Sequence, residues 1–349
     1  MKFLAIVVSL LLSTILHARD KTDIMVMKNG DRFTCAIKGL DSGVLYVDFD
    51  YIDGTASVDW SKVAQLESNQ LFVVKMEDGS VHVGTLHSVS AGPGGPLKIE
   101  VIGSSEPEPS VERSEVVRMI GTSDRFWQRF NGDISLGVIY AKGNQSTQYS
   151  LGSEATYVRQ RWSARASFDS NLASSTGTNV STRNSLHLSG LRLLPAKNWF
   201  YSGIATFLQS SEQGIGLQST IGGGIGHYFK NTDTATVSVL GGVAWQNTEY
   251  KALTVPATGQ NAAAALIYAE ANLFKFSKTN FDVTATLLPA LSDFGRVRFE
   301  TNAAYYIKLI GNLKWNVSFY GNWDSRPPPG FAGSDYGTSS GISWSFGLK

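Results

Sequence analysis

The stretch from Phe294 to Asp324, FGRVRFETNAAYYIKLIGNLKWNVSFYGNWD, alternates between apolar and polar side chains on both sides of a break at Gly311-Asn312. In its first half, one set of alternate positions comprises Val297, Phe299, Thr301, Ala303, Tyr305, Ile307 and Leu309. The other set comprises Arg296, Arg298, Glu300, Asn302, Ala304, Tyr306 and Lys308. Because side chains of a β-strand point alternately to its two faces, this pattern predicts two long antiparallel strands, each apolar on one face. Both exceed the roughly 5–6 residues usual in soluble sheets and reach the roughly 9–11 that a tilted strand needs to cross a bilayer. The stretch therefore predicts a hairpin of a membrane β-barrel.

The composition narrows the possible functions. Of the 349 residues, 42% are hydrophobic and 17% are charged, which is below the roughly 25% charged residues of an average soluble domain. A net charge of +1 argues against a nucleic-acid partner, which requires a basic surplus. The single cysteine, Cys35, excludes an intramolecular disulfide framework and disfavours a structural zinc site. We expect no metal and no cofactor.

The N-terminus has the pattern of a secretory signal peptide. Lys2 precedes an apolar run from Phe3 to Leu16, which is short and lacks a stop-transfer flank. We predict a signal peptide over residues 1–18 with cleavage after Ala18. No later stretch approaches the 18 apolar residues that a transmembrane helix needs. The mature protein is therefore expected to be exported.

Residues 19–121 contain an internal repeat. The turn Asn29-Gly30 superposes on Asp78-Gly79, and the flanking segments match as well. Such dipeptides between alternating runs are strong β-hairpin signals. We predict two periplasmic β repeats, over 19–70 and 71–121, each similar to SH3-like or Sm-like barrels. Since so small a unit buries little surface alone, the two should pack together over a shared set of apolar residues: Trp60, Leu66, Phe72 and Met119.

Four aspartates in the first repeat raise the question of calcium binding. They are Asp41, Asp48, Asp50 and Asp53. Their spacing does not match an EF-hand loop, and alternation places Asp48 and Asp50 on one solvated face of a strand. We interpret them as surface residues.

After a short hinge at 122–129, residues 130–349 predict an antiparallel barrel of twelve strands. Strand-like segments lie near 131–142, 147–158, 161–171, 180–193, 198–209, 215–229, 234–247, 261–275, 279–291, 295–309, 313–324 and 338–349. An even number returns both chain ends to the periplasm. If the first strand runs outward, the inner turns are short and the two longest gaps, 251–260 and 325–334, fall on the outer side. This asymmetry is typical of outer-membrane barrels.

Aromatic residues near the strand ends predict two interfacial girdles. The predicted inner girdle comprises Trp127, Trp162, Trp199, Phe200, Tyr228, Phe229, Phe276 and Trp315. The predicted outer girdle comprises Tyr140, Tyr149, Phe207, Trp245, Tyr250 and Trp323.

The last strand resembles the C-terminal assembly signal of outer-membrane barrels. Ser339, Gly341, Trp344 and Phe346 occupy its polar, glycine and aromatic places, although the chain continues for three residues beyond the last aromatic. We therefore expect the barrel-assembly machinery and outer-membrane lipid as partners. The N-terminal repeats could also bind a periplasmic envelope component.

Signal peptide, repeated β modules and C-terminal barrel together make the chain similar to the YdiY-like family of salt-induced outer-membrane proteins. The likeness covers nearly the whole mature chain, most clearly Gly30-Asp31-Arg32 with its flanking strands and the barrel. This resemblance implies an outer-membrane location, no established activity and no catalytic residues.

Alternation also predicts which charged residues face the lumen. They are Glu154, Arg161, Arg165, Asp169, Glu270, Asp282, Arg296, Arg298, Glu300, Lys308 and Asp324. Acidic and basic side chains are nearly balanced, so strong selectivity for one sign of charge is not expected. Twelve strands lie between the filled barrels of eight and the open pores of sixteen or more.

Three functions remain open from the sequence. The favoured one is a narrow channel for small polar solutes or ions, with the periplasmic module at its mouth. The alternative is a non-conducting anchor that presents the repeats to envelope material or a protein partner. A lipid hydrolase is the least favoured, because His187 has serines at both flanking positions of its face but no visible orienting group.

Overall fold

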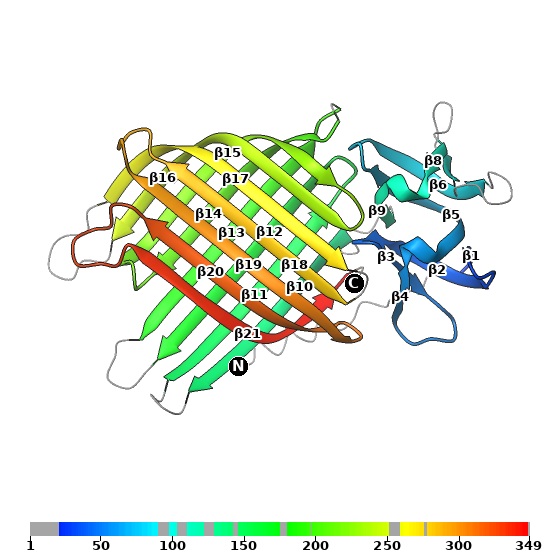
Figure 1. The fold of residues 1–349 in the computed structure, drawn as a ribbon, viewed down its shortest axis with the longest axis horizontal. Coiled ribbons are helices and arrows are strands. Elements are labelled where there is room, and N and C mark those ends of the chain that lie inside the picture. The colour runs from blue at the N-terminus through cyan, green and yellow to red at the C-terminus, as the bar shows by residue number, and fades with distance from the viewer. Residues whose placement is uncertain are drawn as a thin grey trace, which may run out of the picture.

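The computed structural model describes residues 21–89, 98–102, 110–121, 129–141, 146–174, 180–195, 197–250, 259–275 and 278–347. They form two all-β units, an N-terminal module and a large barrel, with the module at one end of the barrel (Figure 1). The predicted signal peptide, its cleavage after Ala18 and nearly all of the hinge 122–129 lie outside the described residues and stay predictions.

Twelve antiparallel strands close into the barrel in chain order, so the predicted all-β class and strand number are confirmed. The strands are β10 (Phe130–Ala141), β11 (Ser146–Val158), β12 (Trp162–Ser174), β13 (Ser181–Leu193), β14 (Trp199–Ser210), β15 (Ile215–Asn231), β16 (Ala235–Tyr250), β17 (Gly259–Lys275), β18 (Thr279–Pro289), β19 (Val297–Ile310), β20 (Leu313–Asp324) and β21 (Ser334–Phe346). The opening hairpin of the sequence analysis is β19–β20, with Tyr305 opposite Val317 in the ladder.

The ring closes where β21 pairs with β10. Gly137 lies opposite Gly341, and Ser135 lies opposite Ser343. A Cβ atom on Gly341 would run into the backbone of Leu136, so glycine permits the close approach of the two strands here. The residues of the predicted assembly signal thus belong to the strand that removes the last free edge of the sheet.

The outer surface of the barrel is apolar. Leu136, Val138 and Val243 are more than 60% exposed, and they alternate with inward residues along their strands. Tryptophans that are also exposed lie towards both ends of the barrel, with Trp162, Trp199 and Trp315 at one end and Trp245 and Trp323 at the other.

Three predicted girdle residues face the interior instead. Phe200 and Tyr250 are only 4% and 8% exposed, and Tyr228 lines the internal cavity. The reason is that successive side chains of a strand point to opposite faces of the sheet. Phe200 directly follows the outward Trp199, and Tyr250 lies an odd number of residues after the outward Trp245, so both point inward. Trp127, Phe276 and the side chain of Tyr140 lie outside the described residues.

The two ends of the barrel differ in their connections. At the end that carries the module, the strands are joined at 159–161, 194–198, 232–234, 276–278 and 311–312. Residues 251–258 lie outside the described residues, and the longer connection 325–333 lies at the opposite end. We call these the inner and outer ends.

The module is built from nine strands and two short 3₁₀ turns. The strands are β1 (Asp23–Met27), β2 (Arg32–Asp41), β3 (Val44–Asp48), β4 (Thr55–Asp59), β5 (Val63–Met76), β6 (Val81–Val89), β7 (Lys98–Ile102), β8 (Ser110–Glu112) and β9 (Val116–Gly121). The turns η1 (Trp60–Lys62) and η2 (Arg113–Glu115) precede β5 and β9. Among the residues that the structure describes, no helix is long and apolar enough to cross a membrane.

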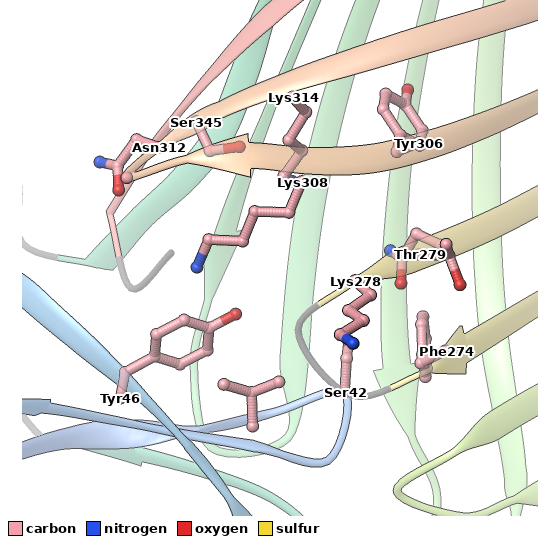
Figure 2. A pocket seen from close by; sticks show the side chains of 13 residues that line it. Ser42, Tyr46, Phe274, Lys278, Thr279, Tyr306, Lys308, Asn312, Lys314 and Ser345 are labelled. Atoms are coloured by element: carbon pink, nitrogen blue, oxygen red, sulfur yellow. The ribbon is translucent and has the colours of Figure 1, made fainter.

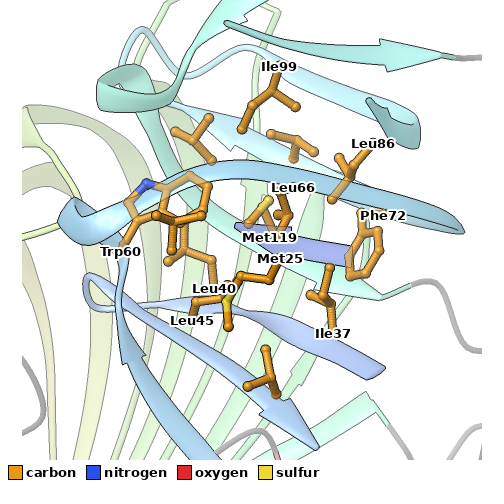
Figure 3. Close-up of a cluster of buried hydrophobic side chains, with 14 of the residues drawn as sticks. Met25, Ile37, Leu40, Leu45, Trp60, Leu66, Phe72, Leu86, Ile99 and Met119 are labelled. Carbon is orange, nitrogen blue, oxygen red and sulfur yellow. The ribbon is translucent and has the colours of Figure 1, made fainter. Parts of the chain in front are cut away.

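The two repeats are joined through one shared strand and one core. β5 is continuous across the predicted boundary at 70/71, and its pairing with β6 shifts register between Ser68 and Phe72. β1 and β9 each pair with both β2 and β5, which closes a small four-stranded barrel from both repeats. As predicted, Trp60, Leu66, Phe72 and Met119 are all fully buried in a single cluster (Figure 3).

This shared core predicts a large effect of one truncation. Leu66→Ala should lower the free energy of unfolding of the module by about 2–5 kcal/mol, because it removes buried methyl groups and leaves a cavity. Leu71→Ala is the matched control, since Leu71 is 49% exposed and Leu66 is 0% exposed. Amide hydrogen exchange of full-length protein would measure both. Loss of protection confined to the first repeat in Leu66→Ala would contradict a shared core.

Candidate functional site in the barrel lumen

The barrel encloses a cavity of about 530 Å³, which we call the chamber. All twelve barrel strands line it, and residues of the module close it at the inner end. The predicted lumen residues that line the chamber are Glu154, Arg161, Arg165, Asp169, Glu270, Asp282 and Glu300. The remaining predicted residues lie beyond its two ends: Arg296, Arg298 and Asp324 towards the outer end, and Lys308 at the inner end.

A layer of polar contacts crosses the lumen towards the outer end, and we call it the ceiling. Ser210 Oγ on β14 donates a hydrogen bond of 2.6 Å to Asp335 Oδ2 on β21, although four strands separate them around the ring. Arg183 on β13 lies 3.9 Å from the same carboxylate and stacks over the ring of Tyr320, 4.3 Å from its centroid. With its amide oxygen facing Arg183, Asn322 accepts from Nε at 3.1 Å and from Nη2 at 2.8 Å. These contacts tie opposite walls together.

A second cluster, the outer clamp, lies near the ends of β16, β19 and β20. Asp324 accepts from Arg296 through both carboxylate oxygens, at 3.0 and 2.7 Å, and from Arg298 at 3.0 Å. Tyr250 and Gln260 accept further hydrogen bonds from Arg296, at 2.9 and 2.6 Å. Buried ion pairs repay their desolvation only when the geometry is good and the remaining donors are satisfied. The outer clamp meets that condition, which explains how these charges are tolerated inside the barrel.

Within the chamber, towards the inner half of the barrel, an ion pair spans the lumen. Arg165 Nη1 on β12 lies 3.1 Å from Glu270 Oε1 on β17, again with four strands between them. Glu154 lies 3.7 Å from the same arginine, and the hydroxyl of Tyr268 donates to Glu270 at 3.3 Å. We call this set the bridge. It lies across the chamber, so a solute that passes through the lumen must pass beside the bridge or part it.

His187 belongs to the wall next to the bridge. Its ring stacks on Tyr268 with the centroids 6.5 Å apart. Ser185 accepts a hydrogen bond from Arg183 at 3.3 Å, and no hydrogen bond between His187 and a serine occurs among the described residues. The geometry therefore brings His187 to an aromatic and ionic cluster rather than to an activated hydroxyl.

One side of the chamber carries a group of acidic side chains, and the other carries a buried apolar cluster. Asp133, Glu154 and Asp169 lie on the adjacent strands β10, β11 and β12. The opposite wall carries a buried cluster on β14 and β16–β18: Phe200, Ile204, Leu240, Ala244, Ala264, Leu266 and Leu288. This cluster narrows the lumen, because apolar side chains pack against one another rather than extend into water.

The module forms the floor of the chamber. Val73 and Lys75 from β5, and Val117 and Ile120 from β9, line its inner end. The ammonium group of Lys75 lies 4.5 Å from the centroid of the Tyr228 ring of the barrel. Burial at this junction, and then the nearby charge of Arg118, lower the pKa of Lys75 to about 8.

A latch of two asparagines holds the floor in place. Asn198 Nδ2 donates to the Glu77 carbonyl at 2.9 Å, and Asn231 Nδ2 donates to the Met76 carbonyl at 3.1 Å. The two side chains are joined by a further hydrogen bond of 2.9 Å. Gly79 has φ +81° and sits against the Asn198 backbone, so a side chain there would be strained and would also collide. The Asp-Gly turn of the second repeat is therefore a docking element.

Three of the four aspartates considered for calcium are engaged by basic side chains. Asp41 lies 3.2 Å from Arg118, Asp48 lies 3.1 Å from Lys38, and Asp50 lies 3.0 Å from Lys21. Within the described ranges, no group of three or more His, Cys, Asp or Glu could hold a metal ion.

Sequence reasoning missed several residues of the ceiling and the floor. Arg183 lies four residues before His187 on β13, so the alternation of side chains places both on the inward face, and this pattern could have identified Arg183 as a lumen residue. Ser210 is the last residue of β14 and Asp335 is the second residue of β21, and nothing in the local sequence marks them as partners. Lys75 lies in the module, where no periodicity relates it to the barrel.

The comparisons with known proteins concern the barrel. A model of the family described as "Protein of unknown function, DUF481" matches residues 134–346. The comparison with curated proteins gave no match. The chain is similar to the translocator domain of the autotransporter NalP from Neisseria meningitidis, with 9% identity, a TM-score of 0.35, and coverage of 62% of this chain and 86% of that chain. It is also similar to the NanC porin, with 11% identity, a TM-score of 0.39, and coverage of 61% of this chain and 98% of that chain. A further porin has 10% identity and a TM-score of 0.29, with coverage of 79% of this chain and 97% of that chain.

The position of Lys75 predicts a pH-dependent stability. Between pH 8 and the value of about 10.4 for an unfolded lysine, the unfolded chain binds more protons than the folded one. Stability contributed by this residue therefore rises with pH across that window. In Lys75→Met this dependence should disappear, so the difference in thermal midpoint between wild type and variant should change by several degrees from pH 7.5 to 10. Lys98→Met, at an exposed position of β7, is the control and should show a constant difference. A constant difference for Lys75→Met as well would contradict the burial of its charge.

Proposed function

The chain belongs to the DUF481 family of proteins of unknown function, and we propose that it is an outer-membrane β-barrel that conducts small polar solutes or ions through a narrow, gated lumen. The observation that carries this proposal is the chamber, a cavity of about 530 Å³ with charged side chains from seven barrel strands. A barrel that served only as an anchor would have no need of such a cavity. The family membership accords with the resemblance to the YdiY-like family, which likewise implies no established activity.

The membrane location is supported by the outer surface. An apolar exterior with tryptophans towards both ends matches the hydrocarbon core and its two interfaces. Short turns at one end and longer connections at the other match periplasmic turns and extracellular loops. On this orientation the module lies in the periplasm, because it docks at the inner end. Trp344, which is exposed on β21, would contact lipid and would also be recognised by the barrel-assembly machinery.

The gating follows from the contacts that cross the lumen. The ceiling and the bridge each join strands on opposite walls, and the latch holds the module over the inner mouth. Side chains make the cross-lumen contacts of the ceiling and the bridge, so these contacts can part without breaking a backbone ladder. Charges of both signs line the chamber, which favours weak selectivity and small polar solutes over a single ionic class.

The same contacts favour a second candidate, a non-conducting anchor. If the ceiling and the bridge stay closed, the barrel would only fix the module to the membrane. The module would then act through its own surface on envelope material or a protein partner. Conductance separates the two functions.

The test is single-channel conductance of refolded full-length protein in planar bilayers. We expect small discrete steps for the wild type and larger or longer ones for Asn198→Ala/Asn231→Ala, because the latch that holds the floor is removed. Asn29→Ala, in the exposed matching turn of the first repeat, is the control and should behave as wild type. Equal behaviour of the latch variant and the wild type would show that the floor does not obstruct passage.

The ceiling gives an independent prediction. Arg183→Gln should raise the single-channel conductance at least severalfold, because Arg183 joins β13 to β20 and β21 across the lumen. Arg192→Gln, at an exposed position of the same strand, should leave it unchanged. Silence of the wild type and all variants, with heat-modifiable migration confirming folded barrels, would favour the anchor.

A further inference from the structure

The two strands that close the barrel are paired with each other along only part of their length. Residues 132–137 of β10 pair with 341–346 of β21, and no further pairing joins these strands among the described residues. Yet β10 continues outward and pairs with β11 along its whole length, and β21 pairs with β20 over its outer half. The outer half of each closing strand therefore lacks its second neighbour. We call this unpaired stretch, 138–141 against 334–340, the split.

Contacts with the opposite wall hold the outer half of β21 away from β10. Asp335 Oδ2 lies 2.6 Å from Ser210 Oγ and 3.9 Å from Arg183, both on strands across the lumen. Along the wall, five strand spacings of about 4.8 Å separate β21 from β14. The side chains of serine and aspartate are short, so the backbone of β21 must lean into the lumen at this level.

The inner half of β21, in contrast, is fixed between the barrel and the module. The Ser345 N–H donates to the Asn312 carbonyl at 3.0 Å, and both residues line a small pocket together with Tyr46 of the module (Figure 2). Where the ladder ends, Gly137 and Gly341 lie opposite each other, and a side chain on either would run into the backbone of the other strand. Beyond this close crossing, which glycine permits, the two strands part.

A side chain replaces the ladder across the split. Gln148 Nε2 on β11 donates a hydrogen bond of 3.1 Å to the Thr338 carbonyl on β21. Gln148 lies opposite Ile139 in the β10–β11 ladder, so its side chain reaches past β10 to make this contact. A continued ladder would instead join β10 to β21 through backbone groups. Because a side-chain hydrogen bond can break and re-form without disturbing a strand pair, the two edges of the split can move apart.

The split separates two different environments. On the lumen side, Ser150, Ser339 and Asn171 line the chamber. Asn171 lies opposite Ser150 in the β11–β12 ladder, and its Oδ1 is buried without a hydrogen-bond partner among the described residues. On the lipid side, Val138 and Tyr336 are 64% and 72% exposed. Unpaired backbone groups are costly in hydrocarbon, so the edges of the split require polar contact from the lumen or from a ligand.

These two environments define the class of ligand. A molecule that occupies the split needs a polar head for the chamber and an apolar chain for the lipid. Asn171 Oδ1 is an acceptor, so the head must carry a hydrogen-bond donor. Gln148 still ties the two edges together, which favours one alkyl chain over the two chains of a phospholipid. We propose that the split is a lateral portal, through which a single-chain amphiphile with a hydroxyl-bearing head passes between the chamber and the outer leaflet.

The portal complements the ceiling. The contacts of Asp335 cross the lumen and obstruct the route along the barrel axis, and the same contacts draw β21 away from β10. A molecule in the chamber therefore meets an obstructed axial exit beside an unpaired stretch of wall. The inference rests on the proposed function for the outer-membrane location, and it adds a route that does not depend on axial conductance.

Photolabelling in vesicles tests the portal. Refolded full-length protein in phosphatidylcholine vesicles would be irradiated with a monoacylglycerol that carries a diazirine in its acyl chain next to the head, and labelled residues would be identified by tandem mass spectrometry. We expect label at Ser150 and Asn171 in the chamber as well as at Val243, which faces lipid and serves as the internal reference. A methyl ester with the same chain and diazirine has no hydroxyl and should label the chamber severalfold less.

A cross-link that closes the split should exclude the probe. Val138→Cys/Ser340→Cys places a disulfide at the first position beyond the last ladder pair. Oxidation should lower chamber labelling, relative to the reference residue, at least severalfold, and reduction should restore it. Leu136→Cys/Ile342→Cys joins two residues that are already paired, so this matched control should leave labelling unchanged. The native Cys35 is fully buried in the module and does not compete for the cross-link.

Gln148→Ala gives a second test that needs no cross-link. It removes the hydrogen bond across the split, so chamber labelling should rise. Chamber labelling that is absent from the wild type, or that neither the cross-link nor Gln148→Ala changes, would overturn the portal. Conductance without chamber labelling would overturn the portal and leave the proposed passage along the axis. Labelling that the cross-link abolishes, in a protein that does not conduct, would do the reverse.

Discussion

The pairing of β21 with β10 is the constraint on which the rest of this structure depends. A sheet with an apolar outer face cannot leave an unpaired edge in lipid, so the ring must close, and Gly137 opposite Gly341 lets it close tightly. Closure also defines an inside. Every residue that alternates with the apolar exterior is forced into a confined space, where its charge must find a partner, bind water or border a cavity.

The lumen resolves this demand in different ways along its length. Towards the outer end, arginines and carboxylates are saturated by hydrogen bonds, as Asp324 shows with two arginines. Further inward, Arg165 and Glu270 pair across the chamber, and an apolar cluster lies on β14 and β16–β18. At the inner end, side chains of the barrel find their partners in the module rather than in the barrel itself. There the module supplies the surface, through Lys75 against Tyr228 and through the carbonyls that the latch engages.

The module can act as a rigid floor because its two repeats are not separate units. They share β5, a closed ring of four strands and one apolar core that includes Trp60 and Met119. Docking uses one turn from each repeat: Gly43 of the first lies against Asp233 of the barrel, and Gly79 of the second lies against Asn198. Two points of attachment define an orientation, and they leave the lysine-lined seam between them and the ends of β17–β21.

The sequence by itself determined the class of fold, the number of barrel strands, the apolar residues at the centre of the module and the face on which most charged residues lie. Each of these depends on local periodicity, because the direction of a strand side chain is set by parity within its own strand. Parity also explains why Phe200 and Tyr250 face inward against the expectation of an aromatic girdle. Only the tertiary structure decided which residues meet across the lumen. Ser210 and Asp335 are 125 residues apart in the chain, and Arg165 and Glu270 are 105 apart, and closure of the ring alone makes them neighbours. Likewise, Asn29-Gly30 and Asp78-Gly79 give the same local turn signal, but only the second engages the latch, because docking depends on the shape of two assembled surfaces rather than on either sequence.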